Sequence, residues 1–252
     1  MNDTQQIPGI YNYCDRWCER CPFTSQCSIY DPEEIDTNNW SEGFFDLMEE
    51  ILDDTLELIR EAIIEEDPEG WDKLMEEILL LPDEMDNPIQ EEPALVGLGR
   101  QYFELSEQWL DTHQEILVAK EVELNQKQNL GVDVSLEGER INDALEVIQW
   151  YLFFISAKIH RAVNGLKDKD MMALMGHQND ANGSAKIALI AIERSLTAWE
   201  TLRSYFPETT DSMLDVLVLL TKLRLGLQQL FPETDKFVRP GFDEMGSAVS
   251  DV

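Results

Sequence analysis

Apolar residues recur at helical spacing along most of the chain, and this periodicity limits the folds that the chain can adopt. Between residues 40 and 67, for example, Phe44, Met48, Ile51 and Ile59 fall on one face and acidic residues on the other. No segment shows the sustained period-two alternation of a half-buried strand bounded by turns. The sequence therefore predicts an all-α bundle of about six helices, preceded by a cysteine-rich loop.

Turn residues and caps divide the chain further. We expect helices over about 40–67, 68–81, 93–127, 139–164, 185–205 and 213–230, with Ser135 and Ser184 as N-caps. The predicted division is a cysteine-rich metal-binding segment and linker at 1–36, a helical bundle at 37–237 and a C-terminal tail at 238–252. At 252 residues, the chain can bury a core without help from metal or disulfides.

The chain is strongly acidic, with 51 Asp and Glu against 19 Lys and Arg and a formal net charge of −32. Residues 31–91 hold 23 acids and only two bases, Arg60 and Lys73. Such a run is usually a solvated helix face, but it could also mimic nucleic acid, dock a basic protein partner or reflect a saline habitat. Because the bases are scattered singly, we expect no direct binding of nucleic acid.

Neither a secretory signal nor a membrane span is predicted. The N-terminus lacks a basic region followed by an apolar core. The longest apolar runs, at 150–155 and 187–192, are far too short to cross a bilayer. We expect a cytoplasmic protein, in which clustered thiols more often hold a metal than a disulfide.

All four cysteines lie in the stretch YNYCDRWCERCPFTSQC, at residues 14, 18, 21 and 27. The thiolates of Cys18 and Cys21 are close enough in sequence to meet one metal, and the arms to Cys14 and Cys27 can complete a four-sulfur cage. Arg16 and Arg20 lie between the thiols, where positive charge favours thiolate. Aromatic residues surround them and can seat the loop on the bundle.

The segment CERCPFTSQC resembles the [4Fe-4S] segment of certain DNA glycosylases and of CRISPR-associated and recombination nucleases. Cys14 departs from that pattern because it lies only four residues before Cys18. The resemblance covers about 15 residues, so it implies a cluster type and no activity. A structural zinc ion remains the alternative, although zinc sites usually carry two C-x2-C pairs. The C-x3-C-x2-C opening also matches the radical-SAM spacing, but the fourth cysteine and the helical chain argue against that class.

The whole chain also resembles an uncharacterised group of bacterial helical proteins with an N-terminal four-cysteine motif. The stretches that carry the resemblance are WCERCPFT and NGSAKIALIAIERSLTAW. It implies the helical fold and no mechanism.

Charged residues interrupt the two most apolar helices. If these helices pack together, five residues could form either an ion-pair network or a pocket for a small anion: Lys158, Arg161, Lys186, Glu193 and Arg194, with Asp143 or Glu146 as further members. No di-iron, thiol-nucleophile or phosphate-loop motif is present. The sequence therefore predicts a metal-binding protein, with an iron–sulfur cluster for electron transfer, redox sensing or structural ordering. The alternative is an acidic interaction or mimic protein with structural zinc.

Overall fold

A computed structural model describes residues 6–31 and 93–243, together with residues 60, 63, 64, 67, 70, 71 and 73. The chain divides into two compact units, Met1–Tyr30 with Pro93–Val252 and Asp31–Glu92. The two helices predicted between 40 and 81, and most of the acidic run 31–91, lie outside the described residues. The first unit joins the cysteine segment to the helices.

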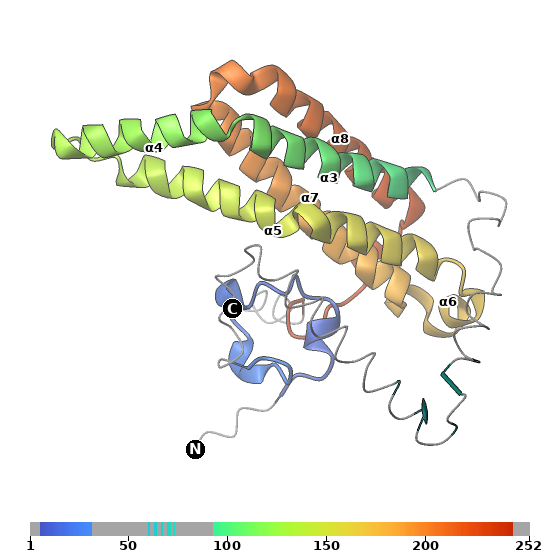
Figure 1. The fold of residues 1–252 in the computed structure, drawn as a ribbon. Coiled ribbons are helices and arrows are strands. Elements are labelled where there is room, and N and C mark those ends of the chain that lie inside the picture. The colour runs from blue at the N-terminus through green and yellow to red at the C-terminus, as the bar shows by residue number, and fades with distance from the viewer. Residues whose placement is uncertain are drawn as a thin grey trace, which may run out of the picture. The chain divides into compact units, whose positions relative to one another are not determined.

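The described residues contain six α-helices and no strand, which confirms the predicted all-α class. The helices are α3 (Ala94–Thr112), α4 (Gln114–Asn129), α5 (Ser135–Gly165), α6 (Lys169–Met175), α7 (Asp180–Tyr205) and α8 (Thr210–Leu230). Four of them form a bundle, in which α3 and α7 each contact α5 and α8 (Figure 1). The most extensive contact joins α5 and α7, the two helices with the most apolar sequence.

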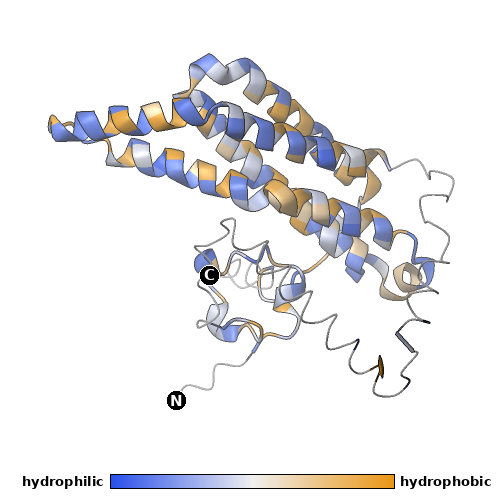
Figure 2. Ribbon diagram, in the orientation of Figure 1, coloured by the Kyte–Doolittle hydropathy of each residue, from blue (hydrophilic) through white to orange (hydrophobic). Residues whose placement is uncertain are grey.

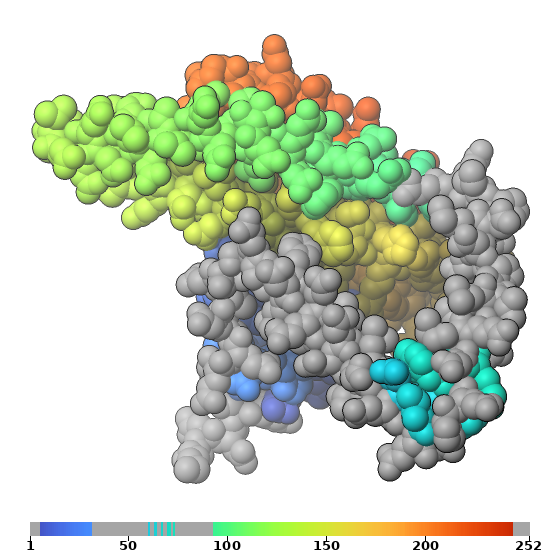
Figure 3. All heavy atoms as spheres, viewed as in Figure 1, coloured from blue at the N-terminus to red at the C-terminus, as the bar shows by residue number. Residues whose placement is uncertain are grey.

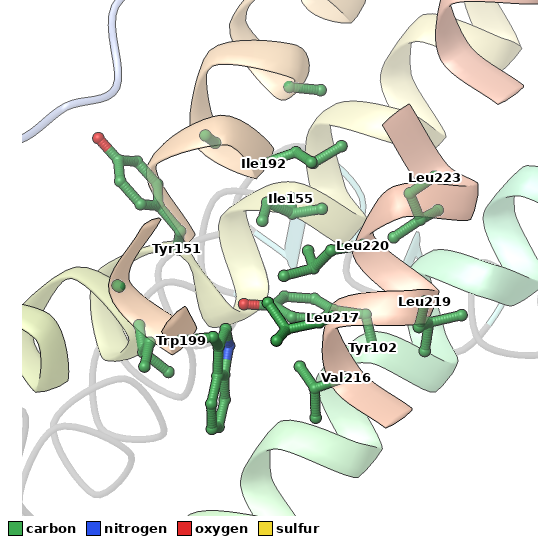
Figure 4. Packing of buried hydrophobic residues seen from close by; sticks show 14 of the residues in the cluster. Tyr102, Tyr151, Ile155, Ile192, Trp199, Val216, Leu217, Leu219, Leu220 and Leu223 are labelled. Atoms are coloured by element: carbon green, nitrogen blue, oxygen red, sulfur yellow. The ribbon is translucent and has the colours of Figure 1, made fainter. Parts of the chain in front are cut away.

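The core lies where the apolar stripes of these four helices face one another (Figure 2). One buried cluster contains Trp199 and Ile192 of α7, Tyr151 and Ile155 of α5, and a run of leucines from α8 (Figure 4). All of these side chains are buried, and the four from α5 and α7 are fully so, so each buries nearly all of its apolar surface. Burial of this kind stabilises the fold by roughly 1.5–3 kcal/mol for each large side chain.

The helix predicted over 93–127 is two helices, and the prediction of one continuous helix is wrong. His113 separates α3 from α4, and its Nδ1 lies 2.8 Å from the carbonyl oxygen of Trp109. The imidazole also stacks on the Trp109 indole. After this break α4 has no buried residue and extends beyond the α3–α8 contact, as the near face in Figure 3 shows.

Two predicted N-caps are also wrong. Ser135 is the first residue of α5, where Asp133 accepts hydrogen bonds from its backbone N–H and its hydroxyl. The helix α7 begins four residues before Ser184, because the side chain of Asn179 accepts from the N–H of Asn182. The short helix α6 was not predicted; Asp168 caps it by accepting from Met171 N–H. The side chains of Asp133, Asp168 and Asn179 accept hydrogen bonds from backbone N–H groups in the first turns, which have no partner within their own helix.

No helix within the described residues is both long and apolar enough to cross a membrane.

Candidate metal centre

The cysteine segment is a closed loop made of three single turns of 3-10 helix. These are η1 (Ile10–Asn12), η2 (Cys18–Arg20) and η3 (Thr24–Gln26). The backbone N–H of Ile7 donates to Gln26 O across 3.0 Å, which ties the start of the segment to its end. All four cysteines are free thiols of intermediate burial. The segment is therefore closed by backbone hydrogen bonds and packing, and its four thiols form no disulfide.

All four thiol side chains line one cavity, together with aromatic and aliphatic residues. Its volume is about 20 Å³, which is room for one water-sized sphere. Within the described ranges, no three His, Cys, Asp or Glu side chains already converge at the spacing of a bound metal ion. The four cysteines thus share a cavity without meeting at one point.

Two backbone N–H groups are directed at the sulfurs. The N–H of Phe23 lies 3.5 Å from Cys21 Sγ. Burial raises the pKa of Cys14, and a hydrogen bond from the Arg16 N–H opposes that rise. Arg16 adopts the left-handed conformation, with φ of 61°, which is uncommon for a residue with a side chain. Donors aimed at sulfur stabilise thiolate, the form that binds metal.

The thiols also affect one another. Burial raises the pKa of Cys18, and the neighbouring charges of Cys14, Cys21 and Cys27 raise it further. Four thiolates in one cavity therefore repel one another unless a cation lies among them. The donor set fits a metal centre, because thiolate is the ligand that zinc and iron–sulfur clusters take from proteins.

Trp17 anchors the segment between Cys14 and Cys18. Its indole is 8 % exposed and stacks on Trp150 of α5, with ring centroids 5.0 Å apart. The guanidinium of Arg20 covers its other side at 3.9 Å from the ring centroid. Arg20 then donates to Asp143 across 2.6 Å and also pairs with Glu146, both on α5. Aromatic burial and cation–π contact together hold this part of the segment on the helix.

Asp15 is a second anchor, which the sequence did not indicate. Its backbone oxygen accepts from Trp150 Nε1 across 2.9 Å. Its carboxylate accepts from the hydroxyl of Tyr151 across 2.7 Å and from Arg194 of α7. The residue that follows Cys14 is thereby fixed to both α5 and α7.

Tyr13 forms a third contact, against the first turns of α7. Its hydroxyl donates to Asp180 across 3.1 Å, and burial followed by the Asp180 charge raises its pKa to about 12. The ring fits against Gly183, where an added Cβ would lie 2.3 Å from Tyr13 Cε1. Only glycine allows this approach.

Residues 237–243 close the segment from the C-terminal side. Phe242 packs edge-on against Phe23, and Phe237 packs against Tyr13. Asp243 accepts from Lys186 of α7 across 2.8 Å and from Arg239. The beginning of the predicted tail 238–252 is thus packed against the cysteine segment.

The five charged residues predicted as one network or pocket do not pair with one another. Arg161 binds Asp180, Lys186 binds Asp243 and the carbonyl oxygen of Phe237, Glu193 binds Arg224, and Arg194 binds Asp15. Asp143 and Glu146, predicted as further members, bind Arg20 instead. Three of these cations hold the cysteine segment or the residues packed on it, because Tyr13 also contacts Asp180.

Lys158 differs from the other cations because it makes no ion pair with a described residue. Its ammonium lies over the ring of Phe154, 5.1 Å from the centroid. Burial lowers its pKa, as do the nearby charges of Arg161 and Arg16, whereas the charge of Cys14 raises it. A cation without an ion-pair partner among the described residues therefore lies near Cys14 and is influenced by its charge.

Comparisons with known proteins give no relative: no family model, curated protein or solved structure matches the chain.

Proposed function

We propose that Cys14, Cys18, Cys21 and Cys27 bind a metal centre, and that this centre is an iron–sulfur cluster. The observation that carries the proposal is that four unpaired thiols line one cavity. Their partial burial and mutual repulsion favour a cationic occupant. Such a cluster supplies a one-electron redox centre when bound.

Two features support a cluster in particular. The N–H groups of Arg16 and Phe23 approach the sulfurs of Cys14 and Cys21, and hydrogen bonds to sulfur are one means by which proteins set cluster potentials. Trp17 and Phe242 line the same cavity, so they would limit the access of water. The segment would serve electron transfer or redox sensing, or it would order the N-terminus on α5 and α7.

One observation favours structural zinc as a second candidate. The cavity of about 20 Å³ suits a single ion better than a cluster of several atoms. In that case the segment would be a structural clip, and the acidic residues 31–91 would be the place to seek a basic protein partner.

The test is the metal content of protein purified without oxygen. A brown protein with about four irons and four sulfides per chain supports the cluster, whereas a colourless protein with about one zinc supports the structural clip. Cys18→Ser should abolish binding of the cluster or of the zinc ion, whichever is present. Ser25→Ala should leave the metal content unchanged, because it removes a neighbouring hydroxyl that does not line the cavity. Metal content that survives the loss of Cys18 would contradict the proposal.

A further inference from the structure

A groove with a volume of about 460 Å³ lies between α5 and α7, which run side by side (Figure 1). This volume is in the range of small-molecule sites. Its polar lining comprises two arginines, four hydroxyl residues and one carboxylate: Arg140, Arg194, Thr197, Thr201, Ser204, Tyr205 and Asp143. No cysteine lines it, so it is separate from the thiol cavity.

The two arginines retain unused donors. Arg140 is exposed and makes no ion pair with a described residue. Arg194 donates from Nη1 to Asp15 and Tyr151, while its Nε and Nη2 make no hydrogen bond to the described part of the chain. Guanidinium groups with free N–H donors bind carboxylate and phosphate well. In a chain of net charge −32, two such groups in one groove form a local site for an anion.

The Thr and Ser hydroxyl groups favour a ligand that also donates hydrogen bonds. Thr197, Thr201 and Ser204 donate their hydroxyl protons to backbone oxygens of α7, across 3.1, 2.8 and 2.7 Å respectively. Their oxygens therefore offer lone pairs to the groove, as does the carboxylate of Asp143, which also accepts from Arg20. A ligand that satisfies this lining needs hydroxyl donors as well as an anionic group.

We propose that the groove binds a small hydroxylated oxyanion, either a phosphate ester or a carboxylate of a polyol or sugar. The anionic group binds the arginines, and the ligand hydroxyls donate to the oxygens along α7. Because Arg194 holds Asp15 through Nη1, a ligand bound to its Nε and Nη2 leaves in place the contact that fixes the residue after Cys14. The proposal does not depend on which metal, if any, the cysteines bind.

The test is calorimetric titration of the full-length protein with four probes: glucose 6-phosphate, gluconate, inorganic phosphate and glucose. We expect glucose 6-phosphate or gluconate to bind at least about tenfold more tightly than phosphate and glucose. The tighter of the two identifies the anionic group as phosphate or carboxylate. Failure of both to bind at up to about 10 mM, or equal affinity for inorganic phosphate, would overturn the proposal.

Variants locate the site. Arg140→Ala should weaken binding by about 10- to 100-fold, since it removes a charged hydrogen-bond donor. Arg203→Ala is the matched control, because Arg203 lies on α7, pairs with Glu200 and does not line the groove. Thr201→Val should weaken binding of the sugar phosphate but not of inorganic phosphate. Equal weakening by Arg140→Ala and Arg203→Ala would indicate general charge attraction and would also overturn the proposal.

Discussion

Tyr151 donates its hydroxyl proton to Oδ2 of Asp15 across 2.7 Å, and this bond fastens the residue after Cys14 to the buried side of α5. A hydrogen bond to a charged group contributes about 1.5–3 kcal/mol. Tyr151→Phe should therefore lower the free energy of unfolding by about 1–2 kcal/mol, since Arg194 still binds Asp15. In protein that carries the proposed metal centre, it should also accelerate release of the metal to a chelator.

Urea unfolding and chelator kinetics check this expectation. Tyr205→Phe is the control, because the Tyr205 hydroxyl makes no hydrogen bond to a described residue. If both variants behaved like the parent protein, Asp15 would not depend on Tyr151 for its position.

Tyr102→Phe should have the opposite effect on stability. The hydroxyl of Tyr102 is fully buried on α3, near Ser106, Ser195 and Trp199, which partly offset the rise that burial causes in its pKa. Yet none of these contacts has the geometry of a hydrogen bond. Figure 4 shows the hydroxyl end of Tyr102 beside the Trp199 indole.

A buried polar group without a partner costs about 1–3 kcal/mol. Removal of the Tyr102 hydroxyl should therefore leave the free energy of unfolding unchanged or raise it by up to about 1 kcal/mol. The measurement is the same urea titration, with Tyr151→Phe as the destabilised comparison. A loss of stability would mean that the hydroxyl has a partner, such as a buried water.

The helical fold and the position of the cysteine segment follow from local pattern. Apolar spacing identifies α5 and α7 as the most buried helices, and the clustering of thiols identifies the candidate site. The acidic partners of the cations could not be predicted from local pattern, because they lie far from the cations in sequence. Arg194 binds Asp15, 179 positions away, and periodicity within α7 contains no information about that loop.

Competition between capping residues and a local ring contact explain the errors in helix boundaries. Ser184 and Asn179 are both good N-caps, and the structure uses Asn179, so that Gly183 lies inside α7. The break at His113 depends on contact between its ring and Trp109, which helix propensity alone does not reveal.

Gly183→Ala should loosen the docking of the cysteine segment on α7. An added Cβ would lie 2.3 Å from the Tyr13 ring and 2.6 Å from Phe237, so both rings must move. We expect a loss of about 1–3 kcal/mol in the free energy of unfolding. Gly138→Ala is the matched control: its nearest neighbour would be Leu124 at 3.9 Å, so it should stabilise α5 by about 0.5–1 kcal/mol. Opposite signs in thermal unfolding support the packing described; equal effects contradict it.

Acid should release residues 237–243 from α7. Burial raises the pKa of Asp243, but hydrogen bonds from Arg239 and Lys186 outweigh it and lower the pKa to about 2. Since this folded-state value lies below the unfolded value of about 3.9, the contribution to stability is present above pH 3.9 and is lost as pH falls towards 2. NMR shifts of residues 237–243 should follow this window. Asp243→Asn should show weakened docking already at neutral pH, and an unchanged acid transition in that variant would assign the titration to another group.

Lys158→Met should lower the reduction potential of the proposed iron–sulfur cluster. The ammonium of Lys158 lies near Cys14, is half-buried and has no ion-pair partner in the described ranges, so its charge is only partly screened. A nearby positive charge favours the form that has gained an electron, and the net charge around a cluster is one determinant of its potential. Lys120→Met is the control, because Lys120 pairs with Glu123 and Glu137 away from the cysteine segment. Redox titration followed by absorbance should show the shift for Lys158→Met alone; equal potentials in both variants would mean that Lys158 does not act on the centre.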